Sequence, residues 1–130
     1  MPDNALRLSF IKLQVEDMDG ALDFWTNAFG FAVRGTYDEP TFFEQILSLP
    51  GEDGGLSLML VQPKPVQPLT LGTAHGPVGF TCDDIATTLE SALAAGATLT
   101  MPITEVAPGV RVCLIHSPQG HEVELVQTGQ

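Results

Sequence analysis

The chain has 130 residues, with 16 acidic and 5 basic side chains and a formal net charge of −11. Hydrophobic residues make up 44% and charged residues 16%, which is typical of a single folded domain and excludes a disordered chain. The basic residues are scattered singly, so no patch can neutralise phosphates. We therefore expect neither nucleic acid nor a membrane surface as a partner. The acidic charge serves solubility alone, or it also steers cationic ligands inward.

Cysteine usage and hydropathy indicate the cellular compartment. Cys82 and Cys113 are too few for a disulfide framework, and residues 2–9 lack the pattern of a secretory signal. No apolar run approaches the roughly 20 residues that a membrane helix needs. We expect a cytoplasmic protein with free thiols.

The first half of the chain begins with a predicted strand and a predicted helix. Residues 6–15 alternate with a period of two, which predicts one apolar face against a packed layer and one mixed face toward a cavity. The mixed face consists of Phe10, Lys12 and Gln14. In the helix that follows, Asp17 or Asp19 is the expected N-cap. An apolar stripe places Trp25 in the core, and Gly30 fits a left-handed helix end.

Further strands are predicted over residues 31–34, 41–49 and 56–62. The glycine-rich stretch 50–55 joins two of them, carries two acidic residues and opens no helix. It therefore predicts a turn and not a phosphate-binding loop. Several prolines then mark an extended linker over about 63–75.

The second half repeats the pattern of the first. It predicts a strand, a helix between Asp84 (or Asp83) and Gly96, and strands over 98–101, 110–116 and 121–126. A shift of 67 residues superimposes Asp17 on Asp84. We therefore predict an α+β fold of two tandem βαβββ modules, about 6–62 and 76–127, which form a curled sheet cup with helices outside. One module alone would leave a sheet face bare, so two modules must pack together, within one chain or between two.

The last two strands are joined by Ser117-Pro118-Gln119-Gly120, whose composition predicts a tight type I turn. A regular ladder through that turn pairs His116 with His121 and Cys113 with Glu124. Cross-strand partners share a face. The residues expected together on that face are Arg111, Cys113, Ile115, Glu122 and Glu124.

Two stretches form family-like signatures. The opening one contains Val15-Glu16-Asp17, Ala21-Leu22-Asp23-Phe24-Trp25 and Phe29-Gly30-Phe31, and the closing one runs from Ser117 to Leu125. Together they resemble the vicinal-oxygen-chelate superfamily, of the glyoxalase, bleomycin-resistance protein and extradiol dioxygenase type. The resemblance covers nearly the whole chain and implies the fold predicted above. It also implies a homodimer, since many relatives pair modules across a two-fold axis. It implies no single reaction, because the fold hosts both enzymes and drug-binding proteins.

The resemblance also implies a metal site built from four strand positions, where His or Glu usually bind a divalent cation that polarises substrate oxygens. Carried over to this chain, these positions fall on Phe10, Met59, Pro77 and Glu124. Of these, Glu124 alone is a usual ligand, since Met59 offers a soft thioether. We therefore expect no cofactor. A divalent metal remains possible if His75 joins Glu124.

Several other side chains are compatible with either a structural or a functional role. Glu124 either pairs with Arg111, diagonally across the hairpin, or serves as a ligand or acid–base group. Cys113 is either an inert buried thiol or a nucleophile. His116 and His121 are either surface histidines or a zinc-binding pair.

Two functional hypotheses follow. The favoured one is a binding protein whose cup takes a small, cationic or aromatic molecule without a metal. Its expected ligand-binding residues are Phe10, Lys12, Gln14, Met59, Arg111, Cys113, Glu122 and Glu124. The alternative is a lyase or isomerase of the glyoxalase type, with Glu124 as base or residual metal ligand. Lys12 or Arg111 would then stabilise developing negative charge, although Lys12 could equally be a snorkelling surface lysine.

Overall fold

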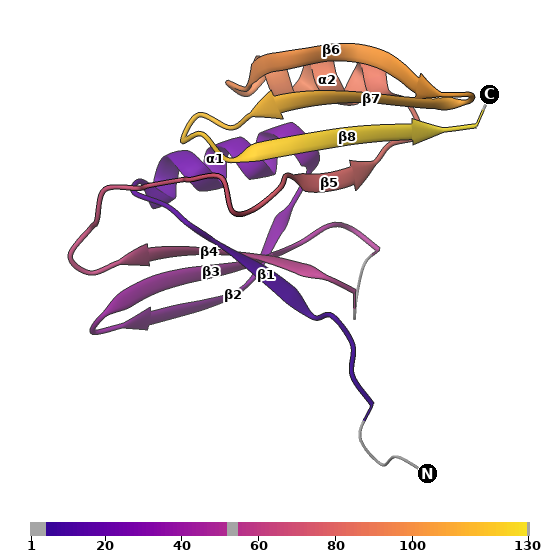
Figure 1. Ribbon diagram of the computed structural model, residues 1–130. Coiled ribbons are helices and arrows are strands. Elements are labelled where there is room, and N and C mark those ends of the chain that lie inside the picture. Colours follow the sequence, from indigo (N-terminus) through magenta and orange to yellow (C-terminus); the bar gives the residue numbers. More distant parts are fainter. Residues whose placement is uncertain (1–4, 52–54, 130) are drawn as a thin grey trace.

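The computed structural model of the protein describes residues 5–51 and 55–129, so part of the predicted turn 50–55 lies outside the described residues. The first half contains β1 (Phe10–Gln14), α1 (Met18–Phe29), β2 (Ala32–Glu39), β3 (Phe42–Ser48) and β4 (Ser57–Pro63). The second half contains β5 (Val78–Thr81), α2 (Ile85–Ala94), β6 (Thr98–Ala107), β7 (Val110–His116) and β8 (Glu122–Thr128). Figure 1 shows the two curled sheets with their helices. This order confirms the predicted α+β fold.

The two sheets have the same topology. Their strand orders are β1-β4-β3-β2 and β5-β8-β7-β6, and in each sheet the first strand runs parallel to the last strand of its half. Strands β4 and β8 are offset by 65 residues along their whole length, from Ser57 and Glu122 at their starts to Pro63 and Thr128 at their ends. Equivalent positions in the two sheets can therefore be compared residue by residue.

Both helices begin at the predicted aspartates. The carboxylate of Asp17 accepts a hydrogen bond from the N–H of Gly20 at 3.1 Å, and that of Asp84 accepts one from the N–H of Thr87 at 3.3 Å. These side chains satisfy N–H groups that lack a partner in the first turn of a helix. At the end of α1, Gly30 has the predicted left-handed conformation, with φ of 85°.

A glutamine from the last strand of each sheet completes each helix start. Oε1 of Gln62 accepts the N–H of Met18 at 2.7 Å, and Oε1 of Gln127 accepts the N–H of Ile85 at 2.7 Å. Both glutamines occupy the same position of the repeat, one in β4 and one in β8. The repeat thus extends from the topology to individual hydrogen bonds.

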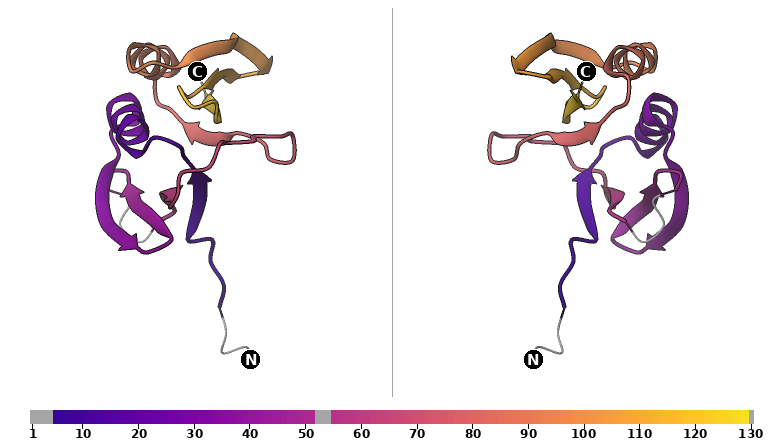
Figure 2. Two further views of the ribbon diagram at one scale, coloured as in Figure 1. Left: turned by 90° about the vertical axis from the view of Figure 1, so that its left-hand side faces the viewer. Right: turned by 90° about the vertical axis from the view of Figure 1, so that its right-hand side faces the viewer.

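The two halves share one hydrophobic core. Helices α1 and α2 lie side by side on one side of the molecule, and β1 and β5 lie on the other (Figure 2). Oγ of Ser91 in α2 donates to the carbonyl of Ala28 in α1 at 3.1 Å. The rings of Phe29 and Phe80 stack with centroids 4.4 Å apart and join α1 to β5. Trp25 is 1% exposed in this core, as predicted. Among the described residues, no helix combines the length and hydrophobicity needed to cross a membrane.

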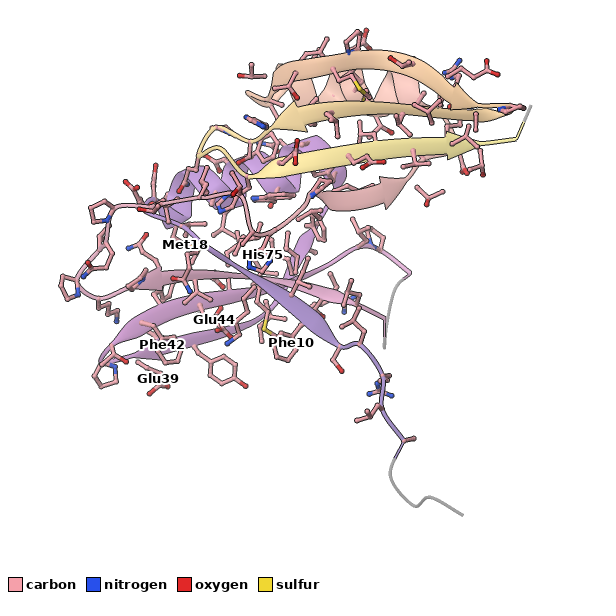
Figure 3. The ribbon with its side chains drawn as sticks, viewed as in Figure 1. Phe10, Met18, Glu39, Phe42, Glu44 and His75 are labelled. Carbon is pink, nitrogen blue, oxygen red and sulfur yellow. The ribbon has the colours of Figure 1, made fainter. Side chains whose placement is uncertain are left out.

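Each helix covers one face of its sheet, and we call the uncovered face the open face. The open face of the first sheet carries Phe10, Lys12, Gln14, Tyr37, Phe42, Glu44, Ile46, Ser57, Met59 and Val61. The open face of the second sheet carries Gly79, Val112, Leu114, His116, Glu122, Glu124 and Val126. Figure 3 shows Phe10, Phe42 and Glu44 on the side of the first sheet that is turned away from α1, with Met18 on the other side.

The hairpin between β7 and β8 corrects the predicted register by one residue. His116 pairs with Glu122, not with His121. The reason lies in the turn, where the carbonyl of His121 accepts the N–H of Ser117 at 2.8 Å and the N–H of His121 donates to Oγ of Ser117 at 3.0 Å. His121 therefore lies opposite Ser117, and Gly120, with φ of 98°, is the extra loop residue that shifts the register by one.

This correction moves side chains between the faces of the second sheet, because a slip of one residue turns each side chain to the other face. Cys113 pairs with Leu125, and Leu114 pairs with Glu124. The predicted grouping of Arg111 and Cys113 with Glu124 is therefore wrong. Arg111 and Cys113 lie on the helix-covered face, whereas Glu124 keeps its place on the open face.

Candidate functional site

The open face of the first sheet contains a partly buried ion pair. Nζ of Lys12 lies 3.1 Å from Oε1 of Glu44, and the two side chains are 45% and 6% exposed. Lys12 stands on β1 and Glu44 on β3, so the pair reaches across β4, which runs between these strands. A carboxylate removed from water is costly unless a cation or hydrogen bonds compensate it. The ammonium of Lys12 supplies such compensation here.

Apolar and aromatic side chains surround this pair. Nζ of Lys12 lies over the ring of Phe10, 5.6 Å from the ring centroid, which is cation–π distance. Met59 is the neighbour of Lys12 in the β1–β4 ladder, and Tyr37 is the neighbour of Glu44 in the β2–β3 ladder. The first sheet thus presents one buried carboxylate among hydrophobic surfaces.

A cavity of about 770 Å³ adjoins this face. Its walls are β1 (residues 11–14), the connecting segment with the start of β5 (69–72 and 75–78), and the β7–β8 hairpin. Lys12 belongs both to this wall and to the open face, so the ion pair stands at the border of the cavity. The polar side chains of the lining include Gln14, His75, His121 and Glu122.

The β7–β8 hairpin is fastened to the first half beside the cavity. Oε1 of Gln119 accepts the N–H of Glu16 at 2.8 Å, and its Nε2 donates to the carbonyl of Asp17 at 2.8 Å. Burial lowers the pKa of His121, although a hydrogen bond with the backbone of Gln14 opposes that shift. Nδ1 of His121 is buried and has no hydrogen-bond partner among the described residues. This part of the cavity wall is therefore held by neutral contacts.

The predicted site residues fall into separate groups. Phe10, Lys12 and Met59 share the open face of the first sheet, and Gln14 and Glu122 line the cavity with Lys12. His75, considered above as a partner of Glu124 in a metal site, also lines the cavity and is itself exposed. Glu124 lies on the open face of the second sheet, outside the cavity lining. The structure therefore brings most of these residues toward Lys12, and Glu124 stands apart.

Arg111 and Cys113 do not join either group. Cys113 is fully buried, and burial raises the pKa of its thiol, which disfavours the reactive thiolate. Arg111 faces away from Glu124, so the predicted pairing across the hairpin is not formed. It lies near Asp84, where its charge contributes to lowering the pKa of that carboxyl after the larger effect of hydrogen bonds from Thr87.

Sequence reasoning missed Glu44. The signal was present in Phe42-Phe43-Glu44-Gln45-Ile46-Leu47, where one carboxylate interrupts an otherwise largely apolar strand. Alternation alone places Glu44 with Phe42 and Ile46 on one face. A carboxylate in such company is buried only at a cost, which makes it a candidate for a functional role.

The residues present do not suit the metal site that the family resemblance implies. Phe10 and Pro77 offer no side-chain ligand atom, and the thioether of Met59 is a poor ligand for a hard cation. The ammonium of Lys12 lies over Phe10, where it would repel a metal ion. Among residues 5–51 and 55–129, no group of three His, Cys, Asp or Glu side chains is placed to hold a metal.

Comparison with known proteins identifies the family. A relative from Vibrio parahaemolyticus, named probable lactoylglutathione lyase, is 29% identical over 95% of this chain and 92% of its own. Similar solved structures include glyoxalase I from Zea mays (22% identity, TM-score 0.85) and a glyoxalase family protein from Bacillus cereus (20% identity, TM-score 0.84). The first match covers 95% of this chain but 45% of the maize chain, and the second covers 100% and 99%. The family model matches residues 7–125, and the chain therefore belongs to the Glyoxalase/Bleomycin resistance protein/Dioxygenase superfamily.

Proposed function

We propose that this protein binds a small molecule with a cationic or aromatic part, without a metal ion, on the open face of the first sheet and in the adjoining cavity. The observation that carries the proposal is the Lys12–Glu44 ion pair beside Phe10 and Met59. This ion pair lies beside Phe10 and Met59, two of the four positions at which the family resemblance implies metal ligands. A cavity of about 770 Å³ has the size of a small-molecule site.

Each part of this site has a role in the proposal. Phe10 and Met59 form an apolar wall for the body of the ligand, and Glu44 offers a carboxylate that little water reaches. Gln14 and Glu122 provide polar contacts at the cavity wall. The net charge of −11 raises the local concentration of cations around the protein.

The proposal also includes a homodimer in the cytoplasm. Strands β1 and β5 are edges of their sheets, and an unpaired edge invites pairing with another chain. A second copy could cover these edges and the open faces beside them. Cys82 and Cys113 are both free thiols, which suits a reducing compartment.

A lyase of the glyoxalase type is the second candidate function. The similarity to the probable lactoylglutathione lyase of Vibrio parahaemolyticus, over 95% of this chain, favours it. Glu124 would then be the base or residual metal ligand, as the family resemblance implies. Glu124 stands on the second sheet and outside the cavity lining, which makes the lyase the weaker candidate.

Calorimetric titration with cationic aromatic compounds, in EDTA and then with added nickel or zinc, tests the main proposal. We expect binding that is independent of metal. Glu44→Gln should lose affinity by about tenfold to a hundredfold, since a charge-assisted contact is worth about 1.5–3 kcal/mol. Asp38→Asn is the matched control, because Asp38 forms an ion pair with Lys64 outside the proposed site.

Two outcomes would count against the proposal. Binding that appears only with metal would mean that side chains outside the four family positions rebuild a metal site. Turnover of a 2-oxoaldehyde–thiol adduct that Glu124→Gln abolishes would establish the lyase instead.

A further inference from the structure

The ammonium of Lys12 occupies a site with the composition of a cation-binding site. One side is the carboxylate of Glu44 at 3.1 Å, and the other is the ring of Phe10, whose centroid lies 5.6 Å away. A buried carboxylate and an aromatic face are the two groups that proteins use to hold organic cations. In this structure the cation that fills the site comes from the chain itself.

The fold does not require this ion pair, as the second sheet shows. Met59 in β4 corresponds to Glu124 in β8, and their partners in the first strands are Lys12 and Gly79. Val61 in β4 corresponds in the same way to Val126 in β8, and their partners in the third strands are Glu44 and Val112.

The second module therefore builds an equivalent sheet with Gly79 and Val112 where the first has Lys12 and Glu44. A buried ion pair contributes little net stability in general, because the loss of hydration offsets the attraction. The presence of the pair in the first sheet alone calls for a reason other than folding.

The two partners differ in how easily they can move. The side chain of Glu44 is 6% exposed and lies between neighbouring strands, so its carboxylate is fixed. The side chain of Lys12 is 45% exposed, has a flexible four-carbon stem and borders the 770 Å³ cavity. Its ammonium can leave Glu44 for the cavity without disturbing the core, provided that another cation takes its place.

We propose that Lys12 is an exchangeable internal occupant of an organic-ammonium site. The ammonium group of the ligand replaces Nζ of Lys12 on Glu44, its apolar or aromatic body lies against Phe10 and Met59, and Lys12 turns toward the cavity. This inference rests on the proposed function and names the group that the site recognises. It has two consequences. Neutral ligands of the same shape do not displace Lys12, and removal of its charge strengthens the binding of ammonium ligands.

The composition of the chain makes the exchange directly observable. Lys12 and Lys64 are its two lysines, so protein labelled with ¹³C at lysine Cε gives one NMR signal for each, and Lys64→Met assigns them. The probe is 2-phenylethylammonium, with 2-phenylethanol as its neutral counterpart. In the free protein the ring of Phe10 should shift the Lys12 signal upfield. Adding the ammonium probe should return that signal to the position of free lysine, while the Lys64 signal and the neutral probe serve as controls.

Two variants complete the test. Lys12→Met should bind 2-phenylethylammonium about tenfold more tightly, corresponding to removal of one competing contact of about 1.4 kcal/mol. Lys64→Met should bind it as the wild type does. In Glu44→Gln, the Lys12 signal should already lie near the free-lysine position and should not respond to the probe.

The outcomes separate this inference from the proposed function. If backbone signals of the open face show that the probe binds while the Lys12 signal stays in place, the exchange is wrong and the binding function stands. If the wild type binds the probe with a shift of the Lys12 signal and Lys12→Met binds it more tightly, the exchange is supported. If Lys12→Met binds the probe and the wild type does not, Lys12 blocks the site and the exchange is wrong. If neither protein binds either probe at millimolar concentration, both the inference and the function proposed for this face are wrong.

Discussion

The two sheets follow one plan and differ in what their open faces carry. In the first sheet, Lys12 and Glu44 form an ion pair across β4, and in the second sheet Gly79 and Val112 stand at the equivalent positions. Conversely, Glu124 of the second sheet corresponds to Met59 of the first. The helix-covered faces are mostly apolar in both sheets, because burial on that side decides folding. The open faces are not constrained by the core in this way, so residues that differ between them are candidates for a functional role.

The two helices differ as well. Phe24, Trp25 and Phe29 of α1 form a cluster of ring contacts, with centroids 5.2 to 5.7 Å apart. The fully buried hydrophobic residues of α2 are Ile85 and Ala92. Aromatic side chains bury the most surface in a core. The first helix therefore contributes more of the shared core than the second.

Trp25→Ala is expected to have the largest effect on stability. Truncation of a buried aromatic residue costs about 3–5 kcal/mol, through lost burial and the cavity left behind. The free energy of unfolding, measured in urea, should fall by that amount. Leu8→Ala, at a side chain that is 75% exposed, is the control and should change it by less than about 0.5 kcal/mol. A loss below about 1 kcal/mol for Trp25→Ala would contradict the larger contribution of α1 to the shared core.

The second prediction concerns variants that replace the ion pair of the first sheet by apolar side chains, as in the second sheet. Lys12→Met leaves Glu44 without the ammonium beside it and should cost about 1–3 kcal/mol of unfolding free energy. The double variant Lys12→Met/Glu44→Leu should recover most of this loss, because hydrophobic residues often replace an ion pair at no cost. Chemical denaturation measures both.

Lys64→Met is the matched control for this series. The Lys64–Asp38 pair is exposed on both sides, with side chains 40% and 66% exposed, so its removal should cost less than about 1 kcal/mol. If the double variant is as unstable as Lys12→Met, the ion pair supports the fold. The difference between the two sheets would then not indicate a functional role for the pair.

Most of the fold could be predicted because the sequence repeats its local signals. Asp17, Gly30 and Asp84 marked helix ends through capping chemistry that depends on near neighbours alone. Strands β2 and β6 proved longer than expected, reaching Glu39 and Ala107. Both contain irregular register, at Val33 to Gly35 in β2 and between Leu99 and Ala107 in β6. Such bulges interrupt the alternation on which a strand prediction depends.

The candidate site was less predictable, because it depends on register and on contacts between strands. The assumed four-residue turn placed His121 opposite His116, and that error of one residue moved Arg111 and Cys113 to the wrong face. Lys12 was placed on the correct face by alternation within one strand. Its partner Glu44 lies two strands away and 32 positions along the chain, where periodicity gives no information on pairing.

The third prediction concerns a feature that the two halves share. Gln62→Ala and Gln127→Ala each leave the first N–H of a helix without its acceptor at 2.7 Å. Each should lower the unfolding free energy by about 1 kcal/mol, the usual effect of losing a helix-capping contact. The two losses should be similar, and should add in the double variant because the contacts share no partner. Clearly unequal losses would show that the two hydrogen bonds, although equivalent in geometry, contribute differently to the free energy of unfolding.

The smallest expected effect belongs to the second half alone and depends on pH. Burial lowers the pKa of His121 in the folded protein, so the unfolded chain, with a pKa of about 6.5, takes up the proton first as the pH falls. The contribution of neutral His121 to the free energy of unfolding is therefore fully present above about pH 7.5. It declines below about pH 6.5, by at most about 1.4 kcal/mol per pH unit. His121→Gln should flatten this decline in urea unfolding measured from about pH 7.5 down to about pH 5, whereas His75→Gln, at an exposed site, should keep it. An unchanged slope in His121→Gln would mean that the hairpin tolerates the charge, and that its attachment to the first half does not depend on a neutral imidazole.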